Sequence, residues 1–107
     1  MRTRKIGKSN LFVSELTLGT MSIGTDKTKG IKIINHAIDK GINHIDTADL
    51  YDFGINEQIV GEAIKGKREK IILTTKVGNH FNKELKDWYW DPSKNYIKTA
   101  VQNSLKR

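Results

Sequence analysis

Three short strand-like segments, each followed by a helical pattern, most constrain what this chain can fold into. The segments are residues 16–18, 42–46 and 71–76, and their carboxyl ends lie 28 and 30 residues apart. Short strands that alternate with amphipathic helical patterns are typical of parallel sheets whose strands are joined by crossover helices. The sequence therefore predicts about three β/α units in one parallel sheet.

The stretches between these strand-like segments carry apolar side chains at helical spacing. A first helix is expected to follow Asp26 and to end before Gly41, and a second closes near Gly66. A third opens with Asp91 as N-cap and Pro92 as its first residue, and runs to the end of the chain. The apolar faces of the three helices are, in order, Ile31, Ile34, Ala37 and Ile38; Ile55, Ile59, Val60, Ala63 and Ile64; and Ile97, Ala100, Val101 and Leu105.

A hairpin over residues 4–13 is expected before the first unit, with a turn-forming cluster at 7–10. Units of about 30 residues suit either an open doubly wound sheet or a (β/α)8 barrel. The segment 19–24 lacks the G-x-G-x-x-G turn of the dinucleotide-binding sheet, which favours the barrel. The predicted fold class is α/β: the amino-terminal portion of a (β/α)8 TIM barrel, made of a hairpin and about three β/α units.

Length and composition limit the class of protein. A chain of 107 residues holds one small domain and is too short for two. Its basic start leads into polar residues rather than a signal peptide, and no apolar run approaches the roughly 18 residues of a membrane helix. The absence of cysteine excludes disulfides and thiolate metal sites and agrees with a reducing compartment. We therefore expect a cytoplasmic protein with no membrane partner.

The formal net charge of +7 raises the question of an anionic partner. Basic residues are spread over four segments, 2–8, 27–32, 65–70 and 94–107, and acidic residues are mixed among them. A dispersed pattern of this kind is typical of solvated helix faces rather than of a nucleic-acid-binding stripe. We expect no nucleic-acid partner.

Three chemically active side chains stand at the carboxyl ends of two predicted strands. Asp46 ends the second strand, Tyr51 follows it in the loop, and Lys76 ends the third strand. Tyrosine is a poor proton donor at neutral pH because its ordinary pKa is about 10, so acid chemistry needs a nearby cation. Lys76 can supply that cation with Asp46 as its partner, although taken singly each is equally explained as a turn cap or a solvent-facing lysine.

Other polar and aromatic groups carry weaker signals. Three carboxylates spaced by three residues, at positions 46, 49 and 52, lack the spacing and closing glutamate of an EF-hand, so no metal is expected. The aromatic run at 88–90, in the loop after the third strand, either walls a substrate pocket or packs over the rim of a barrel. We interpret the histidines as structural or exposed; they are His36, His44 and His80.

The ordered motifs of the chain resemble the aldo-keto reductase family. They are Gly19-Thr20-Met21, Asp46-Thr47-Ala48-Asp49-Leu50-Tyr51 with residues 54–61, and Thr75-Lys76-Val77-Gly78. The resemblance covers essentially the whole chain. It implies that residues 1–107 are the amino-terminal fragment of an aldo-keto reductase domain, with the hairpin plugging one end of the barrel.

The resemblance also implies a reaction and its residues. The family reduces a small-molecule aldehyde or ketone with a nicotinamide cofactor, usually NADPH, bound across the carboxyl-terminal face of the barrel. By this likeness Tyr51 is the general acid, Lys76 the cation beside it, and Asp46 the carboxylate that pairs with Lys76. The residues implied to lie near the nicotinamide are Gly19, Thr20, Met21 and Asp46.

Two departures from the family pattern lead to further expectations. The family places a catalytic histidine after a fourth strand, which this sequence does not reach, and the segment 51–54 puts two residues between tyrosine and glycine where many members have none. The alternative to a reductase is therefore a catalytically inactive, truncated remnant or an interaction fragment. We expect the isolated 107 residues to lack activity and to self-associate through an exposed sheet edge.

Overall fold

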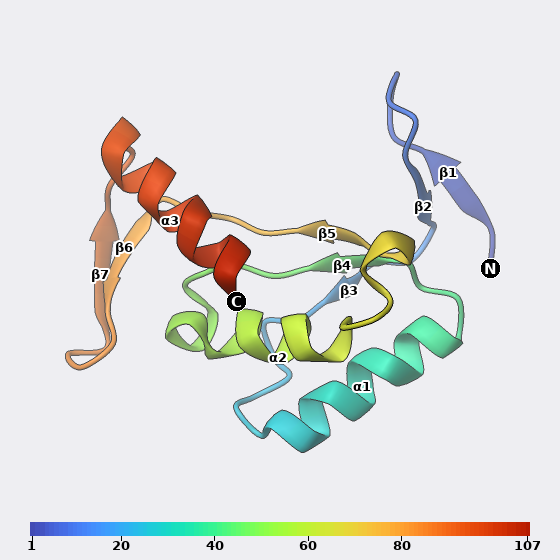
Figure 1. Cartoon of the computed structure of the whole chain (residues 1–107), viewed down its shortest axis with the longest axis horizontal. Coiled ribbons are helices and arrows are strands. Elements are labelled where there is room, and N and C mark those ends of the chain that lie inside the picture. Colours follow the sequence, from blue (N-terminus) through green and yellow to red (C-terminus); the bar gives the residue numbers. More distant parts are fainter.

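A parallel sheet of three strands forms the centre of the molecule (Figure 1). The computed structural model describes residues 1–107, and its strands β3 (Leu18–Gly19), β4 (His44–Asp46) and β5 (Ile72–Thr74) are neighbours in that order. Both pairs are parallel, and the register sets Asp46 beside Gly19 on one side and beside Thr74 on the other. The carboxyl ends of the strands therefore meet at one edge, as the β/α pattern predicted.

Two helices, α1 (Lys27–Asp39) and α2 (Ile55–Ala63), lie on the same side of this sheet (Figure 1). The core between helices and sheet is aliphatic and consists of Ile23, Ile34, Ile45, Ile59, Val60, Ala63, Ile64 and Ile71. A doubly wound sheet has helices on both faces, whereas a barrel keeps them all outside. The one-sided arrangement is that of barrel units.

The ends of the first two helices follow from short-range chemistry. The Asp26 carboxylate accepts a hydrogen bond from the Lys29 backbone N–H at 3.0 Å, which satisfies one of the free donors of the first turn of α1. After the C-cap of α1, Gly41 has a φ of 95°, and after α2 Gly66 has a φ of 76°. Both glycines adopt the left-handed conformation that ends helices, so these boundaries were predicted correctly.

The third helix, α3 (Lys94–Lys106), differs from its prediction in two ways. Its N-cap is Ser93, whose hydroxyl accepts from the Tyr96 N–H, so the assignment of Asp91 was wrong. The Asp91 carboxylate instead accepts from the Ser93 N–H and contacts His80, which holds it outside the helix. The predicted apolar face is mostly open, because Ala100 is its only buried residue and Leu105 is 82% exposed.

Two antiparallel hairpins flank the parallel sheet. The first, β1 (Thr3–Lys5) with β2 (Phe12–Ser14), was predicted. The second, β6 (Asn79–Asn82) with β7 (Asp87–Trp90), occupies the segment that we expected to be a loop. Short 3-10 turns complete the chain at η1 (Tyr51–Gly54) and η2 (Arg68–Lys70), and none of the helices is long and apolar enough to cross a membrane.

Candidate active site

Pairing between β4 and β5 continues past the ends of the strands and sets two segments side by side. The Thr47 N–H donates to the Thr74 carbonyl at 2.9 Å, and the Asp49 N–H donates to the Lys76 carbonyl at 3.1 Å. These bonds fix the backbone just before the predicted acid, Tyr51, and up to its predicted cation, Lys76. The register therefore determines which side chains meet at the carboxyl edge of the sheet.

Lys76 is the point where the three predicted residues meet. Its ammonium donates to the Asp46 carboxylate at 2.7 Å and to the Thr47 carbonyl at 2.8 Å. It also lies 3.4 Å from the Tyr51 hydroxyl oxygen, longer than a typical hydrogen bond, and 5.1 Å from the centre of the tyrosine ring. The expected convergence of carboxylate, phenol and ammonium is thus present in the folded chain.

The charge of Lys76 is stabilised by its neighbours. Burial disfavours the ammonium, but hydrogen bonds and negative charge from Asp46 and Tyr51 outweigh it and raise the pKa of the Lys76 side chain above its ordinary value. The side chains of Lys76 and Asp46 are 49% and 30% exposed, so the pair remains open to solvent and to small molecules. A permanent cation beside an accessible phenol is the arrangement that proton transfer from tyrosine requires.

The segment after β3 is held by a buried polar network that sequence reasoning missed. The Asn56 carbonyl oxygen accepts from the hydroxyls of Thr20 and Thr47, both at 2.7 Å, and its amide donates to the Thr20 carbonyl at 2.8 Å. All three side chains are buried. Asn56 lies within the motif at 54–61, but only its partners show that it connects α2 to two loops.

Because of this network, the residues predicted to contact a cofactor differ in how open they are to a ligand. Thr20 is fully buried, and its hydroxyl, N–H and carbonyl all have partners within the protein. Gly19 is exposed with open space where a Cβ would stand, Met21 is exposed, and Asp46 stays partly open at the end of β4. Gly19, Met21 and Asp46 can therefore meet a ligand, whereas the Thr20 side chain positions the loop.

The turn after Tyr51 has an unusual backbone. Asp52 and Phe53 have φ values of 48° and 51°, and Gly54 follows with 94°. Left-handed conformations are costly for residues with a Cβ, and two in succession occur only where the surroundings impose them. The Phe53 ring lies 5.9 Å from the ring of Phe81 on β6, so the second hairpin contacts this turn.

Beneath the turn lies a second charged group, also missed from the sequence. Glu57 accepts from the Arg107 guanidinium at 2.7 Å and from the Thr75 hydroxyl at 2.6 Å, and its side chain is only 5% exposed. Asp49 is buried nearby, and burial first and the charge of Glu57 second raise the pKa of its carboxyl to about 6. The only hint in the sequence was the presence of acidic residues beside the predicted acid.

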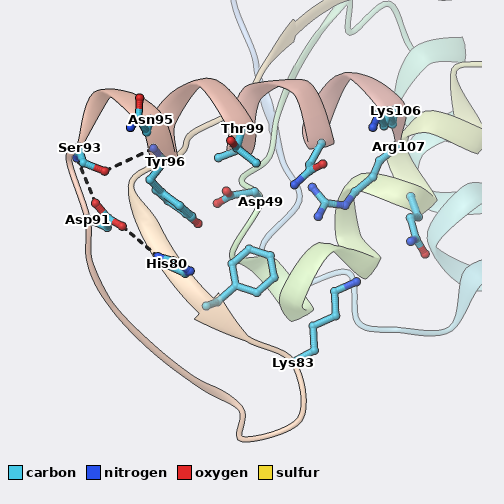
Figure 2. A pocket seen from close by; sticks show the side chains of 14 residues that line it. Asp49, His80, Lys83, Asp91, Ser93, Asn95, Tyr96, Thr99, Lys106 and Arg107 are labelled. Atoms are coloured by element: carbon cyan, nitrogen blue, oxygen red, sulfur yellow. Dashed lines mark hydrogen bonds and ion pairs between the residues drawn. The ribbon is translucent and has the colours of Figure 1, made fainter.

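A wide cavity lies apart from the Lys76 group. It has a volume of about 1000 Å³ and is lined by residues of α3, the second hairpin and the start of α2, with Asp49 facing it and neither Tyr51 nor Lys76 among its residues. Figure 2 shows Asp49 between the helix and the hairpin, and the bonded series His80, Asp91 and Ser93 at one end. Size alone therefore does not identify the chemical centre.

The aromatic run on β7 lines neither this cavity of about 1000 Å³ nor a second cavity of about 160 Å³. Trp88, Tyr89 and Trp90 are all exposed, and the two tryptophan rings contact each other edge to face at 5.2 Å. His80 stacks between the rings of Tyr89 and Tyr96. Whether the run walls a substrate pocket or packs over the rim of a barrel stays a prediction.

The sequence of the chain matches a known protein family. The family model described as the aldo/keto reductase family matches residues 15–107. The chain belongs to the aldo/keto reductase family. Among curated proteins, this aldo-keto reductase chain is 57% identical to a Bacillus subtilis protein named uncharacterized oxidoreductase YqkF, over all of its own length and 35% of that protein.

Solved structures agree with the family assignment. The holo form of an aldo-keto reductase from Bacillus halodurans matches 99% of the chain and 36% of its own length, with a TM-score of 0.96 and 56% identity. An aldo-keto reductase from Klebsiella pneumoniae in complex with NADPH matches 89% of the chain and 31% of its own length, with a TM-score of 0.70 and 28% identity. The predicted fold class is confirmed, since these neighbours are (β/α)8 barrels.

The extent of the match is as informative as its quality. This aldo-keto reductase chain spans about a third of the length of the curated relatives that it matches, 35% and 34% for two from Bacillus subtilis. It supplies a hairpin, three strands and their helices, together with the Lys76 group. The chain therefore corresponds to only part of a whole reductase.

Proposed function

We propose that the chain provides the acid half of an NADPH-dependent carbonyl reductase acting on a small aldehyde or ketone. The observation that carries the proposal is the position of the Lys76 ammonium, 2.7 Å from the Asp46 carboxylate and 3.4 Å from the Tyr51 hydroxyl. Membership of the aldo/keto reductase family supports the reaction class. The Klebsiella pneumoniae relative in complex with NADPH supports the choice of cofactor.

In this proposal Tyr51 gives its hydroxyl proton to the carbonyl oxygen of the substrate. The Lys76 ammonium faces the phenol oxygen and stabilises the negative charge that develops there. Asp46 accepts a charge-assisted hydrogen bond from the Lys76 ammonium. The lysine side chain is therefore already in place when the reaction begins. NADPH, when bound, would supply the hydride that the carbonyl carbon receives.

The residues at the edge of the sheet fit a nicotinamide group. Gly19 leaves open space at the end of β3, Met21 offers an exposed apolar side chain, and Asp46 offers a partly exposed acceptor. The Thr20 side chain is left out of the proposed contacts, because its hydroxyl is committed to Asn56. The proposed cofactor contacts are thus Gly19, Met21 and Asp46, with Thr20 positioning the first two.

A chimaera tests the proposal. Residues 1–107 would replace the matching part of the Bacillus halodurans reductase, which is 56% identical over this stretch. We expect this chimaera to oxidise NADPH in the presence of aldehydes, and Tyr51→Phe to lower turnover by roughly 10² to 10⁴-fold, the usual contribution of a general acid. NADPH binding, followed by fluorescence titration, should survive the substitution because the ring is retained.

Tyr96→Phe is the matched control, since Tyr96 also loses a hydroxyl but lies on α3 and donates to the Asn79 carbonyl. Its turnover should stay close to that of the parent chimaera. Equal turnover in the Tyr51→Phe and Tyr96→Phe proteins would remove Tyr51 from the role of acid.

A second role, self-association, is favoured by one feature of the sheet. Strand β5 pairs only with β4, so its outer edge presents unpaired N–H and carbonyl groups. Exposed edges of this kind bind a further strand. We propose that two copies of the chain associate along this edge. We also propose that the chain resides in the cytoplasm, because a sequence without cysteine agrees with a reducing compartment.

A further inference from the structure

Glu57 is a buried carboxylate that joins three separate parts of the fold. It lies in the first turn of α2, accepts from the Thr75 hydroxyl just after β5 at 2.6 Å, and accepts from the Arg107 guanidinium after α3 at 2.7 Å. The side chains of Glu57 and Arg107 are 5% and 14% exposed. We refer to Glu57, Thr75 and Arg107 as the Glu57 clamp.

The clamp contacts the segments that carry the acid and its cation. Thr75 directly precedes Lys76, so its bond to Glu57 ties the lysine-bearing backbone to α2. At the other side, the Arg107 guanidinium lies against Gly54, three residues after Tyr51, with its Nε 2.8 Å from where a Cβ would stand. The clamp thus reaches both segments without touching the phenol or the ammonium.

The tyrosine segment needs such a restraint. Asp52 and Phe53 adopt left-handed backbone conformations with φ values of 48° and 51°, each of which costs roughly 1 to 3 kcal/mol outside glycine. A turn with this strain returns to ordinary backbone angles unless tertiary contacts oppose it. The Arg107 guanidinium over Gly54 and the Phe53–Phe81 ring contact are the contacts that hold its two sides.

Apart from the contacts that Lys76 itself makes, the bonds between the two segments join backbone groups, which most substitutions would preserve. The Glu57 clamp depends on particular side chains, and removing one partner of a buried ion pair leaves an uncompensated charge, so the clamp geometry is tied to these residues. We propose that Glu57, Thr75 and Arg107 are positioning residues that hold Tyr51 in register with Lys76. This inference rests on the proposed reductase function only for its effect on turnover.

Thr75→Val tests the clamp with little change in volume, because it removes only the hydroxyl that Glu57 accepts. In the 107-residue chain, NMR titration of the Lys76 side-chain carbons reports its pKa, which burial lowers and the contacts of the ammonium with Asp46 and Tyr51 raise more strongly. We expect Thr75→Val to move this pKa down toward its ordinary value, because the ammonium leaves its partners. Thr75→Ser restores the hydroxyl and should restore the titration.

The chimaera with the Bacillus halodurans reductase supplies a second readout. Thr75→Val and Glu57→Gln should each lower kcat by roughly 10 to 100-fold, the size expected for a small misplacement of reacting groups, with KM for NADPH unchanged. Arg2→Met is the control, since it removes an arginine from an exposed ion pair with Glu15. It should change neither kcat nor the Lys76 titration.

The two proposals fail in different ways. A folded Thr75→Val chain with the parental Lys76 titration and parental kcat would overturn the clamp. A Tyr51→Phe chimaera with parental turnover would overturn the reductase mechanism, while a shifted Lys76 titration in Thr75→Val would still support the clamp as the device that sets this geometry.

Discussion

Asp49 shows how strongly a single side chain depends on its neighbours. It is buried two residues before Tyr51, and one carboxylate oxygen has no hydrogen-bond partner. Burial and the Glu57 charge raise its pKa to about 6, and the Arg107 charge opposes them. Tyr96 on α3 is a further ionisable neighbour of Asp49, and its pKa is raised chiefly by burial and then by the Asp49 charge.

We predict that Asp49→Asn stabilises the chain at pH 8 but not at pH 4. The folded-state pKa of about 6 lies above the ordinary 3.8, so the folded state binds the proton more tightly and this contribution is lost as pH rises through 6. A shift of this size corresponds to an upper limit of about 3 kcal/mol above pH 6. Denaturant unfolding at both pH values measures the change in the free energy of unfolding. Asp49→Ala should remove the same pH dependence while lowering the stability at both pH values.

An Asp49→Asn protein that was less stable than its parent at pH 8, or equally changed at both pH values, would contradict this account. The result would mean that the Arg107 charge outweighs burial at this position.

The residues of the site were predictable to different degrees. Asp46, Tyr51 and Lys76 were found because parallel strands bring their carboxyl ends together, so position along the sequence was enough. Asn56 and Glu57 were missed because a helix-borne polar residue is ordinarily solvated, and only tertiary structure gives these two their partners. Thr20 lies in a loop, and its burial likewise depends on partners that only the tertiary structure supplies.

At the scale of elements, the crossing of α1 and α2 depends on one small residue. Gly30 is buried in α1, and a Cβ there would meet the Cγ2 atom of Ile59 on α2 at 2.7 Å. Ile59 is β-branched and has little freedom to rotate within a helix. The glycine therefore permits the close approach that builds the aliphatic core.

Gly30→Ala should destabilise the chain although alanine is the better helix former. The propensity gain is about 1 kcal/mol, whereas overpacking a filled core costs typically 1 to 3 kcal/mol, so the net change is destabilising. Urea denaturation followed by circular dichroism measures it, and Lys32→Ala, at an exposed position of the same helix, should stay within about 0.5 kcal/mol of the parent. A more stable Gly30→Ala protein would show that the helices can separate without loss.

Elements with regularly spaced apolar residues were predicted. The second hairpin and the start of α3, which have no such spacing, were not. Apolar spacing gave α1, α2 and the parallel strands, because burial against a common core imposes that spacing. The β6–β7 hairpin was missed because β7 is exposed throughout and β6 is only partly buried, so no alternating burial pattern marks the two strands. The cap of α3 was misplaced because Asp91 and Ser93 are both good caps, and contact with His80 decides between them.

At the scale of the molecule, the sheet is covered on one side and open along one edge. Strand spacing of 28 and 30 residues and the missing phosphate turn predicted barrel units, and the helices on one side agree with it. A cavity of about 160 Å³ lies between β5, α2 and α3 and is lined in part by Leu73, Val101 and Leu105. An open strand edge next to apolar side chains is a surface on which further chain can pair.

We predict that the 107-residue chain forms dimers or larger species through this surface. Sedimentation should give a mass above the 12.2 kDa of one chain, rising with concentration. Leu105→Lys should shift it toward monomer, because a charge beside β5 opposes pairing of a second copy. Leu85→Lys is the matched control, since Leu85 is 72% exposed but lies in the turn of the second hairpin, and it should leave the mass unchanged. A monomer at all concentrations, or equal effects of the two lysines, would mean that the β5 edge is not the surface of association.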